Sequence, residues 1–175
     1  MTGTGIFYAK LRMDEVEKLL LEVITGKAGY WYNLQGYFNF KTGLSDDTWG
    51  SLQLISVYDG QIKGFLAATI DRDTLNINNL NAVKFCDGHD EEFAADMARV
   101  FKFCLKHFRA IHWTCASGSP TEVIYGKIAK NFGGTAINAN PNFYRLRDGR
   151  FADCISFYVP GSRDPDGLTD ITEIQ

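Results

Sequence analysis

Two cysteine–histidine pairs in this chain have the spacing of metal ligands. Cys86 with His89 and Cys104 with His107 both read Cys-x-x-His. Thiolates and imidazoles are the usual ligands of structural zinc. A helical pattern, however, separates His89 from Cys104 by fifteen residues, which is about 22 Å along a helix axis. Zinc holds its ligands within about 2.3 Å of one point, so we expect no metal site here.

A single histidine, His112, is the next candidate, because imidazole exchanges protons near neutral pH. It falls in a short apolar run, residues 110–116, which reads as a strand. In a strand its side chain would point to the opposite face from those of Ile111 and Trp113. It is either a hydrogen-bonded histidine of the core or of a cleft, or a base in a functional site. The chain has no Gly-x-Ser-x-Gly turn, which would carry a nucleophilic serine. It also has no Gly-Lys-Ser or Gly-Lys-Thr sequence, which would mark a phosphate-binding loop.

Composition and charge narrow the class of protein. Hydrophobic residues make up 45% of the chain and charged residues 22%, which is typical of a globular domain. The net charge of −3 resides in residues 160–175, which hold four acids and one arginine. The remainder is near neutral, so we expect no nucleic-acid partner. No apolar run reaches the ~18 residues of a membrane span and no signal peptide is recognisable, so we expect a cytoplasmic protein without a membrane partner.

Hydrophobic periodicity predicts the elements that must position these residues. The predicted strands are residues 6–11, 52–58, 61–70, 75–85, 110–116, 135–146 and 151–159, and the predicted helices are 14–25, 91–108 and 120–131. Their order is strand, helix, long loop, three strands, helix, strand, helix and two strands. This order predicts an α/β fold with a mixed sheet, in which hairpins turn at Asp59-Gly60 and Asp148-Gly149.

The strand at 75–85 shows a slip in its alternation. Leu75 and Ile77 occupy odd positions and would lie on one face of the strand, whereas Leu80 and Ala82 occupy even positions and would lie on the other. A slip of this kind predicts a β-bulge among the asparagines of the segment.

The long loop after the first helix is rich in aromatic residues. Its candidates for contact with a substrate or a partner are Tyr30, Trp31, Tyr37, Phe38 and Trp49. The loop has neither a helical nor a strand period. It either folds over the core as an apolar cap or lines a binding cleft.

Several of these features combine into one pattern between residues 52 and 159. They are the Asp59-Gly60 hairpin, the bulged strand, the helix at 91–108, the run Ile111-His112-Trp113-Thr114-Cys115-Ala116, the segment Ser119-Pro120-Thr121-Glu122-Val123-Ile124-Tyr125 with the following Phe132-Gly133-Gly134, and the closing hairpin. This pattern resembles the GNAT superfamily of N-acyltransferases and, more loosely, GNAT-like proteins encoded by bacteriophages. The resemblance implies a three-layer fold with a twisted central sheet. We expect one such domain over residues 1–159 and an acidic tail over 160–175.

The resemblance also implies a mechanism. The parallel strands 75–85 and 110–116 would splay apart, and the pantetheine arm of acetyl-coenzyme A would lie in the gap. The backbone of Val83, Lys84 and Phe85, together with Gly88 and Ser119, would bind this cofactor. Tyr125, which could otherwise simply pack under the sheet, would return a proton to the departing thiolate. The acceptor would be a primary amine, on a small molecule or a protein, with Asp73 or Glu122 as further candidate bases.

The segment that should hold the cofactor's diphosphate departs from the family pattern of Gln or Arg, two residues, Gly, one residue, and Gly or Ala. It reads Cys86-Asp87-Gly88-His89-Asp90-Glu91-Glu92, with one glycine and four acids. Acidic side chains in the first turn of a helix interact with the positive end of its dipole, where a phosphate would otherwise bind. Each of them also repels a phosphate by roughly 1 kcal/mol. The sequence therefore supports two hypotheses. One is an N-acetyltransferase with a degenerate loop, and the other is an inactive GNAT-fold protein that binds another protein or its own copies, in the host cytoplasm or in a virion.

Overall fold

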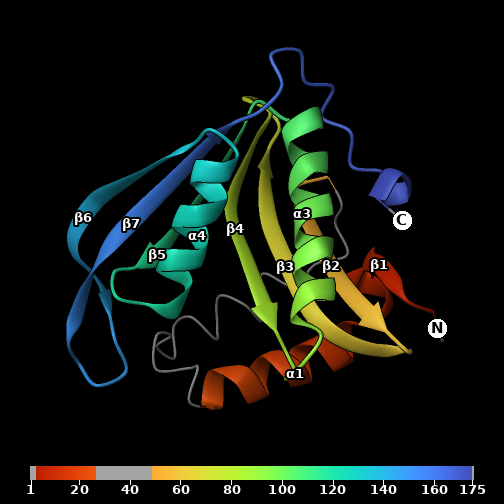
Figure 1. Cartoon of the computed structure of the whole chain (residues 1–175), viewed down its shortest axis with the longest axis horizontal. Helices are drawn as coiled ribbons and strands as arrows, with labels where there is room; N and C mark the ends of the chain where they lie inside the picture. Colours follow the sequence, from red (N-terminus) through yellow and green to blue (C-terminus); the bar gives the residue numbers. More distant parts are fainter. Residues whose placement is uncertain (1–2, 27–48, 175) are drawn as a thin grey trace.

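The computed structural model of the chain describes residues 3–26 and 49–174, which form a seven-stranded sheet flanked by helices (Figure 1). The strands are β1 (Gly5–Tyr8), β2 (Ser51–Tyr58), β3 (Gln61–Asp71), β4 (Asn76–Lys84), β5 (Ala110–Ala116), β6 (Thr135–Arg145) and β7 (Phe151–Pro160). The helices are α1 (Met13–Thr25), α3 (Asp90–His107) and α4 (Pro120–Asn131), with 3-10 turns η1 (Ala9–Leu11) and η3 (Ile171–Ile174). The spatial order is β1-β2-β3-β4-β5-β7-β6. Only the β4–β5 pair of this sheet is parallel.

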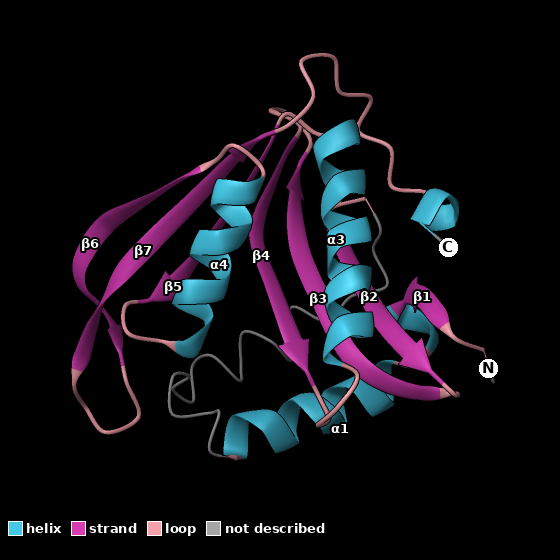
Figure 2. Cartoon of the chain, in the orientation of Figure 1, coloured by secondary structure: helices cyan, strands magenta, loops and turns pink. Residues whose placement is uncertain are grey.

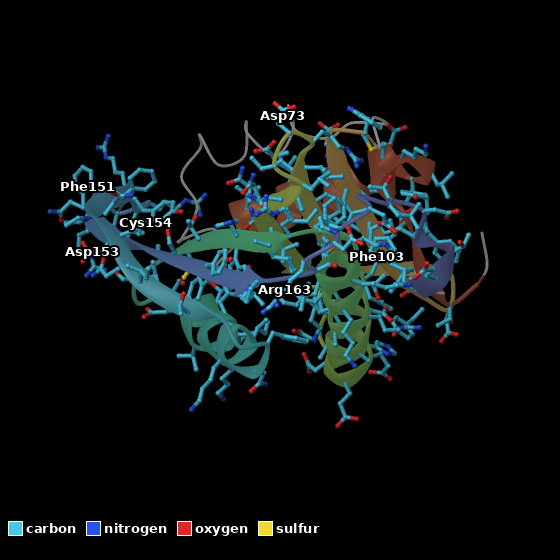
Figure 3. All side chains as sticks on the ribbon, turned by 90° about the horizontal axis from the view of Figure 1, so that it is seen from above. Asp73, Phe103, Phe151, Asp153, Cys154 and Arg163 are labelled. Carbon is cyan, nitrogen blue, oxygen red and sulfur yellow. The ribbon has the colours of Figure 1, made fainter. Side chains whose placement is uncertain are left out.

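The sheet separates two apolar cores, which confirms the predicted three layers. Helices α3 and α4 cover one face, where Val100 and Phe101 pack with Leu66 and Ile77. Helix α1 covers the other face, where the second core lies. Figure 3, a view from above, shows α3 and α4 on the opposite side of the sheet from α1. Among the described helices, none combines the length and the apolar character needed to cross a bilayer.

The β2–β3 hairpin has the geometry that its sequence predicts. Asp59 and Gly60 have φ angles of 51° and 75°, both in the left-handed region. Two consecutive residues of this kind form the tight turn whose twist matches that of paired strands. Strand β3 then runs between β2 and β4 (Figure 2). Its buried side chains belong to both cores.

The first strand is shorter than predicted. β1 ends at Tyr8, and residues Ala9–Leu11 form a 3-10 turn that leads into α1. Ala9 is fully buried within this turn, so its apolar character reflects packing under α1 rather than continued strand pairing.

The acidic tail at residues 160–175 contributes to the core, which the expected domain boundary at residue 159 leaves out. Ile171 and Ile174 of η3 are buried in the same core as α3. The backbone N–H of Gly167 donates to the carbonyl of His107 at 2.9 Å, and the ring of His107 lies between Asp166, at 2.7 Å, and Glu173, at 3.3 Å. The tail is therefore docked on the C-terminal end of α3 and is part of the domain.

Candidate functional site

Strands β4 and β5 part shortly after they meet. Their parallel pairing covers Asn76 with Ala110 and Ile77 with Ile111. β4 nevertheless continues along β3 as far as Lys84, and β5 continues along β7 as far as Ala116. Each strand thus stays paired on its outer side while the inner side opens, which confirms the predicted divergence of these two strands.

A β-bulge marks the point where the strands separate. Asn79 has a φ of 54°, and the β3–β4 register shifts between Ala67 and Thr69. The side-chain amide of Asn79 donates to the hydroxyl of Thr69 at 3.2 Å, which holds the bulged residue. Asparagine tolerates a positive φ better than most residues, so the asparagine run supplies a residue that can form the bulge.

The three predicted backbone contacts, Val83, Lys84 and Phe85, do not face the same way. The N–H of Phe85 donates to the carbonyl of Lys63 on the β3 side at 2.9 Å. Since N–H groups along an antiparallel strand alternate between its two sides, Val83 also faces β3, whereas Lys84 and Ala82 face the gap. The amides of Ala82 and Lys84 are therefore the ones aimed between the strands.

Tyr125 lies on α4, on the α3 side of the sheet. The buried Ser119 is the N-cap of this helix, which begins at Pro120. The half-buried ring of Tyr125 meets Trp113 edge-on at 6.1 Å between centroids, and Phe157 at 5.9 Å. The ring thus packs under the sheet, as one alternative predicted, and it does so beside the strand that borders the gap.

His112 occupies the opposite face of the sheet from Tyr125. It alternates with the core residues Ile111 and Trp113, is half-buried, and packs against the ring of Tyr158 at 4.9 Å. Burial lowers the pKa of His112, so the ring is neutral at neutral pH and able to accept a proton. On the same face, the hydroxyls of Thr114 and Tyr144 lie 2.6 Å apart, a pair that sequence reasoning missed because the two residues are thirty positions apart.

The first turn of α3 is acidic, as the sequence requires. Gly88 and His89 have φ angles of 75° and 55°, and the helix then starts with Asp90, Glu91 and Glu92. Lys84, at the end of β4, forms an ion pair with Asp90. His89 lies 3.6 Å from Glu92 and stacks on Tyr58, with 5.6 Å between ring centroids.

The aromatic candidates of the long loop come next. Tyr30, Trp31, Tyr37 and Phe38 are outside the described residues. Trp49 is 71% exposed, and its ring lies 4.4 Å from the guanidinium carbon of Arg72.

The two candidate carboxylate bases do not face the gap as free groups. Asp73 follows β3 in the turn that leads to the paired end of β4, away from the opening. Glu122 accepts a hydrogen bond from the backbone N–H of Gly118 at 2.6 Å and so helps to start α4. The Cys-x-x-His residues do not converge either, because His89 precedes the 18-residue helix α3 whose last turns carry Cys104 and His107. Burial raises the pKa of Cys104 to about 12, so this thiol stays protonated. In the part of the chain that the structure describes, no cluster of three His, Cys, Asp or Glu side chains could hold a metal ion.

No protein-family model and no curated protein sequence matches the chain. A putative acetyltransferase from Acinetobacter baylyi has a similar fold, with a TM-score of 0.68 and 11% identity over 93% of this chain and 96% of that one. A ribosomal-protein-alanine N-acetyltransferase from Brucella melitensis gives 0.65 and 11%, over 89% of this chain and 98% of that one. A spermidine N-acetyltransferase from Vibrio cholerae, in complex with CoA and spermine, gives 0.63 and 12%, over 90% and 95%.

These structural neighbours share the arrangement of strands and helices with this chain at very low sequence identity. The likeness covers nearly the whole of both chains in each case. The fold of this chain is therefore that of the GNAT acetyltransferases, as the pattern between residues 52 and 159 predicted.

Proposed function

We propose that the chain is an acyl-coenzyme A-dependent N-acyltransferase that transfers an acetyl group from acetyl-coenzyme A to a primary amine. The observation that carries this proposal is the gap between β4 and β5, which pair over two residues and then diverge. The acetyltransferase fold of the solved neighbours supports it. The acceptor is an amine on a small molecule or on a protein.

The residues around the gap fit the pantetheine arm of such a donor. The amides of Ala82 and Lys84 face the gap and would stabilise negative charge on a carbonyl oxygen there. When bound, acetyl-coenzyme A supplies the thioester carbon that the amine attacks. In this transfer the amine would form the C–N bond and lose one proton, and the thiolate released from the C–S bond would gain one.

Two side chains on opposite faces of the sheet could handle these protons. Tyr125 holds a proton on its hydroxyl on the α4 side, where it would serve as the acid. The neutral ring of His112 on the other face would accept the proton of the amine, directly or through water. An acid and a base on opposite faces of the sheet can act on one substrate only if that substrate reaches both faces through the gap.

The diphosphate of the coenzyme fits less well. The first-turn N–H groups of α3 have no partners within the helix and suit an anion. The carboxylates of Asp90, Glu91 and Glu92 surround the same turn, and Lys84 is already paired with Asp90. We therefore expect weak binding of the coenzyme rather than its loss.

A second candidate function follows from the same acidic turn. If these acids exclude the coenzyme, the chain is a GNAT-fold protein without catalysis that binds another protein or its own copies. A phage virion or assembly component, in the host cytoplasm or in the particle, would fit this alternative. Edge strand β6 supports it, because all but one of its residues are exposed and could pair with a partner strand.

A thermal shift titration with acetyl-coenzyme A and with coenzyme A tests the two candidates. At one hundred times the dissociation constant, binding adds about 2.7 kcal/mol, which raises the melting temperature by about 5–10 °C for a chain of this size. A flat response at millimolar ligand would favour the protein-binding alternative, which a pull-down from the native source then examines.

A Tyr125→Phe variant separates binding from catalysis. It should show the same thermal shift as the unmodified protein and, in an acceptor screen, a turnover lower by about 10²–10⁴. Equal turnover in the two proteins would remove Tyr125 from the mechanism.

A further inference from the structure

The indole nitrogen of Trp113 is an unpaired hydrogen-bond donor inside the protein. Trp113 is 2% exposed, and in the described part of the chain its Nε1 is buried without a hydrogen-bond partner. Nearly all buried N–H groups in proteins have a partner, because an unpaired one lowers stability. A donor left in this state therefore calls for an acceptor that the chain itself does not supply.

The position of Trp113 indicates where that acceptor would come from. It lies on β5 two residues beyond Ile111, the last residue of β5 that is in register with β4. Its ring stacks on Phe157 of β7, with centroids 5.4 Å apart, and meets Phe101 of α3 edge-on at 5.5 Å. Tyr125 of α4 is its third ring neighbour. The indole thus packs among α3, α4 and β7, and it belongs to the strand that borders the gap, beyond the point where β4 and β5 cease to pair.

We propose that Trp113 Nε1–H binds a carbonyl oxygen of the acyl donor's pantetheine arm and so positions the thioester beside Tyr125. This inference rests on the proposed function. The arm offers carbonyl oxygens in its amides and its thioester, and each is a suitable acceptor for a single neutral N–H donor. With the gap-facing amides of Ala82 and Lys84 on the β4 side, the arm would receive donors from both bordering strands.

Proton–nitrogen NMR of the indole groups tests this directly, with coenzyme A and acetyl-coenzyme A as separate ligands. The chain has three tryptophans. Comparison with Trp113→Phe and Trp49→Phe spectra identifies the Trp113 signal. If Trp113→Phe does not fold, contacts of the indole with the rings of Tyr125 and Phe157 identify it instead.

We expect the Trp113 indole proton to move downfield on titration, because a new hydrogen bond deshields it. Movement with coenzyme A alone would place the acceptor among the pantetheine amides, and movement only with acetyl-coenzyme A would place it at the thioester. Trp113→Phe should weaken binding of the ligand about tenfold, whereas Phe151→Leu, at an exposed site at the start of β7, should leave it unchanged.

Two results would overturn the inference, and they differ in what they say of the proposed function. If the backbone amides of Ala82 and Lys84 shift with ligand while the Trp113 indole stays in place, the coenzyme binds without Trp113 and the proposed function stands. If none of these signals moves at millimolar ligand, both the inference and the proposed function are wrong.

Discussion

Neutralising Asp90 should strengthen coenzyme binding. Asp90 opens α3 and forms an ion pair with Lys84, the last residue of β4. A diphosphate seated on the first-turn N–H groups would lie about one helical turn, or roughly 6 Å, from this carboxylate. Asp90→Asn removes the repulsion and releases the Lys84 ammonium toward the same anion.

The size of the effect follows from Coulomb's law. Two unit charges about 6 Å apart interact by about 0.7 kcal/mol in water, so the two charges of a diphosphate give about 1.4 kcal/mol. This corresponds to about tenfold tighter binding at low salt. At 0.1 M salt the Debye length is about 10 Å, which reduces the gain to about fourfold. The folded state itself should change little, since an exposed ion pair contributes about 0–1 kcal/mol.

Isothermal titration of Asp90→Asn with coenzyme A at two salt concentrations measures this gain. Asp164→Asn is the matched control, because Asp164 lies beyond the far end of the 18-residue helix α3, about 27 Å from its first turn. It should leave the affinity unchanged. An Asp90→Asn affinity equal to that of the unmodified protein at low salt would refute the placement of the diphosphate. Equal tightening by both variants would mean that net charge, not the local site, controls binding.

Two further predictions concern the fold. Gly134→Ala should destabilise the protein by about 3 kcal/mol or more in urea denaturation, because a Cβ there would lie 2.2 Å from a backbone carbonyl oxygen of β7; an unchanged midpoint would contradict this packing. The docked tail should detach in acid. The pKa of Asp166 is lowered by hydrogen bonds from the Leu168 backbone and from His107, and that of Glu173 by hydrogen bonds from Lys106 and His107. A lowered carboxyl pKa stabilises the folded state fully above its unfolded value, near 4, and this is lost as pH falls through the folded value. Hydrogen exchange of η3, corrected for intrinsic rates, should therefore accelerate below about pH 4. Constant protection down to pH 3 would show that Asp166 and Glu173 do not hold the tail.

Much of the fold can be predicted from the sequence because it depends on local patterns. The alternation slip between Ile77 and Leu80 predicts the bulge that the structure places at Asn79. Proline at the start of α4 and Asp59-Gly60 between two strands are equally local signals. The element order then leaves few topologies, since consecutive strands pair and a helix must cover each apolar face.

The burial of the C-terminal tail could not be predicted from the sequence, because it is not a local property. Ile171 and Ile174 have no periodic neighbours, and they are buried because α3 presents a second apolar side to them. Phe103, labelled in Figure 3, is a buried residue of α3 in this core. Its ring tilts against that of His107, with 4.6 Å between the ring centroids. An interaction between segments about 65 residues apart leaves no pattern within either one.

For the candidate site, the sequence identified the two strands that border the gap, and only the tertiary structure decided which of their residues face it. Tyr125 and His112 were both identified from the sequence, but strand parity and helix packing place them on opposite sides of the sheet. The β3–β4 register directs the amide of Lys84 toward the gap and that of Phe85 away from it. The unpaired Nε1 of Trp113 is likewise a consequence of packing among three elements. Residue type and spacing specify what a group can do, whereas the groups it meets depend on contacts between distant segments.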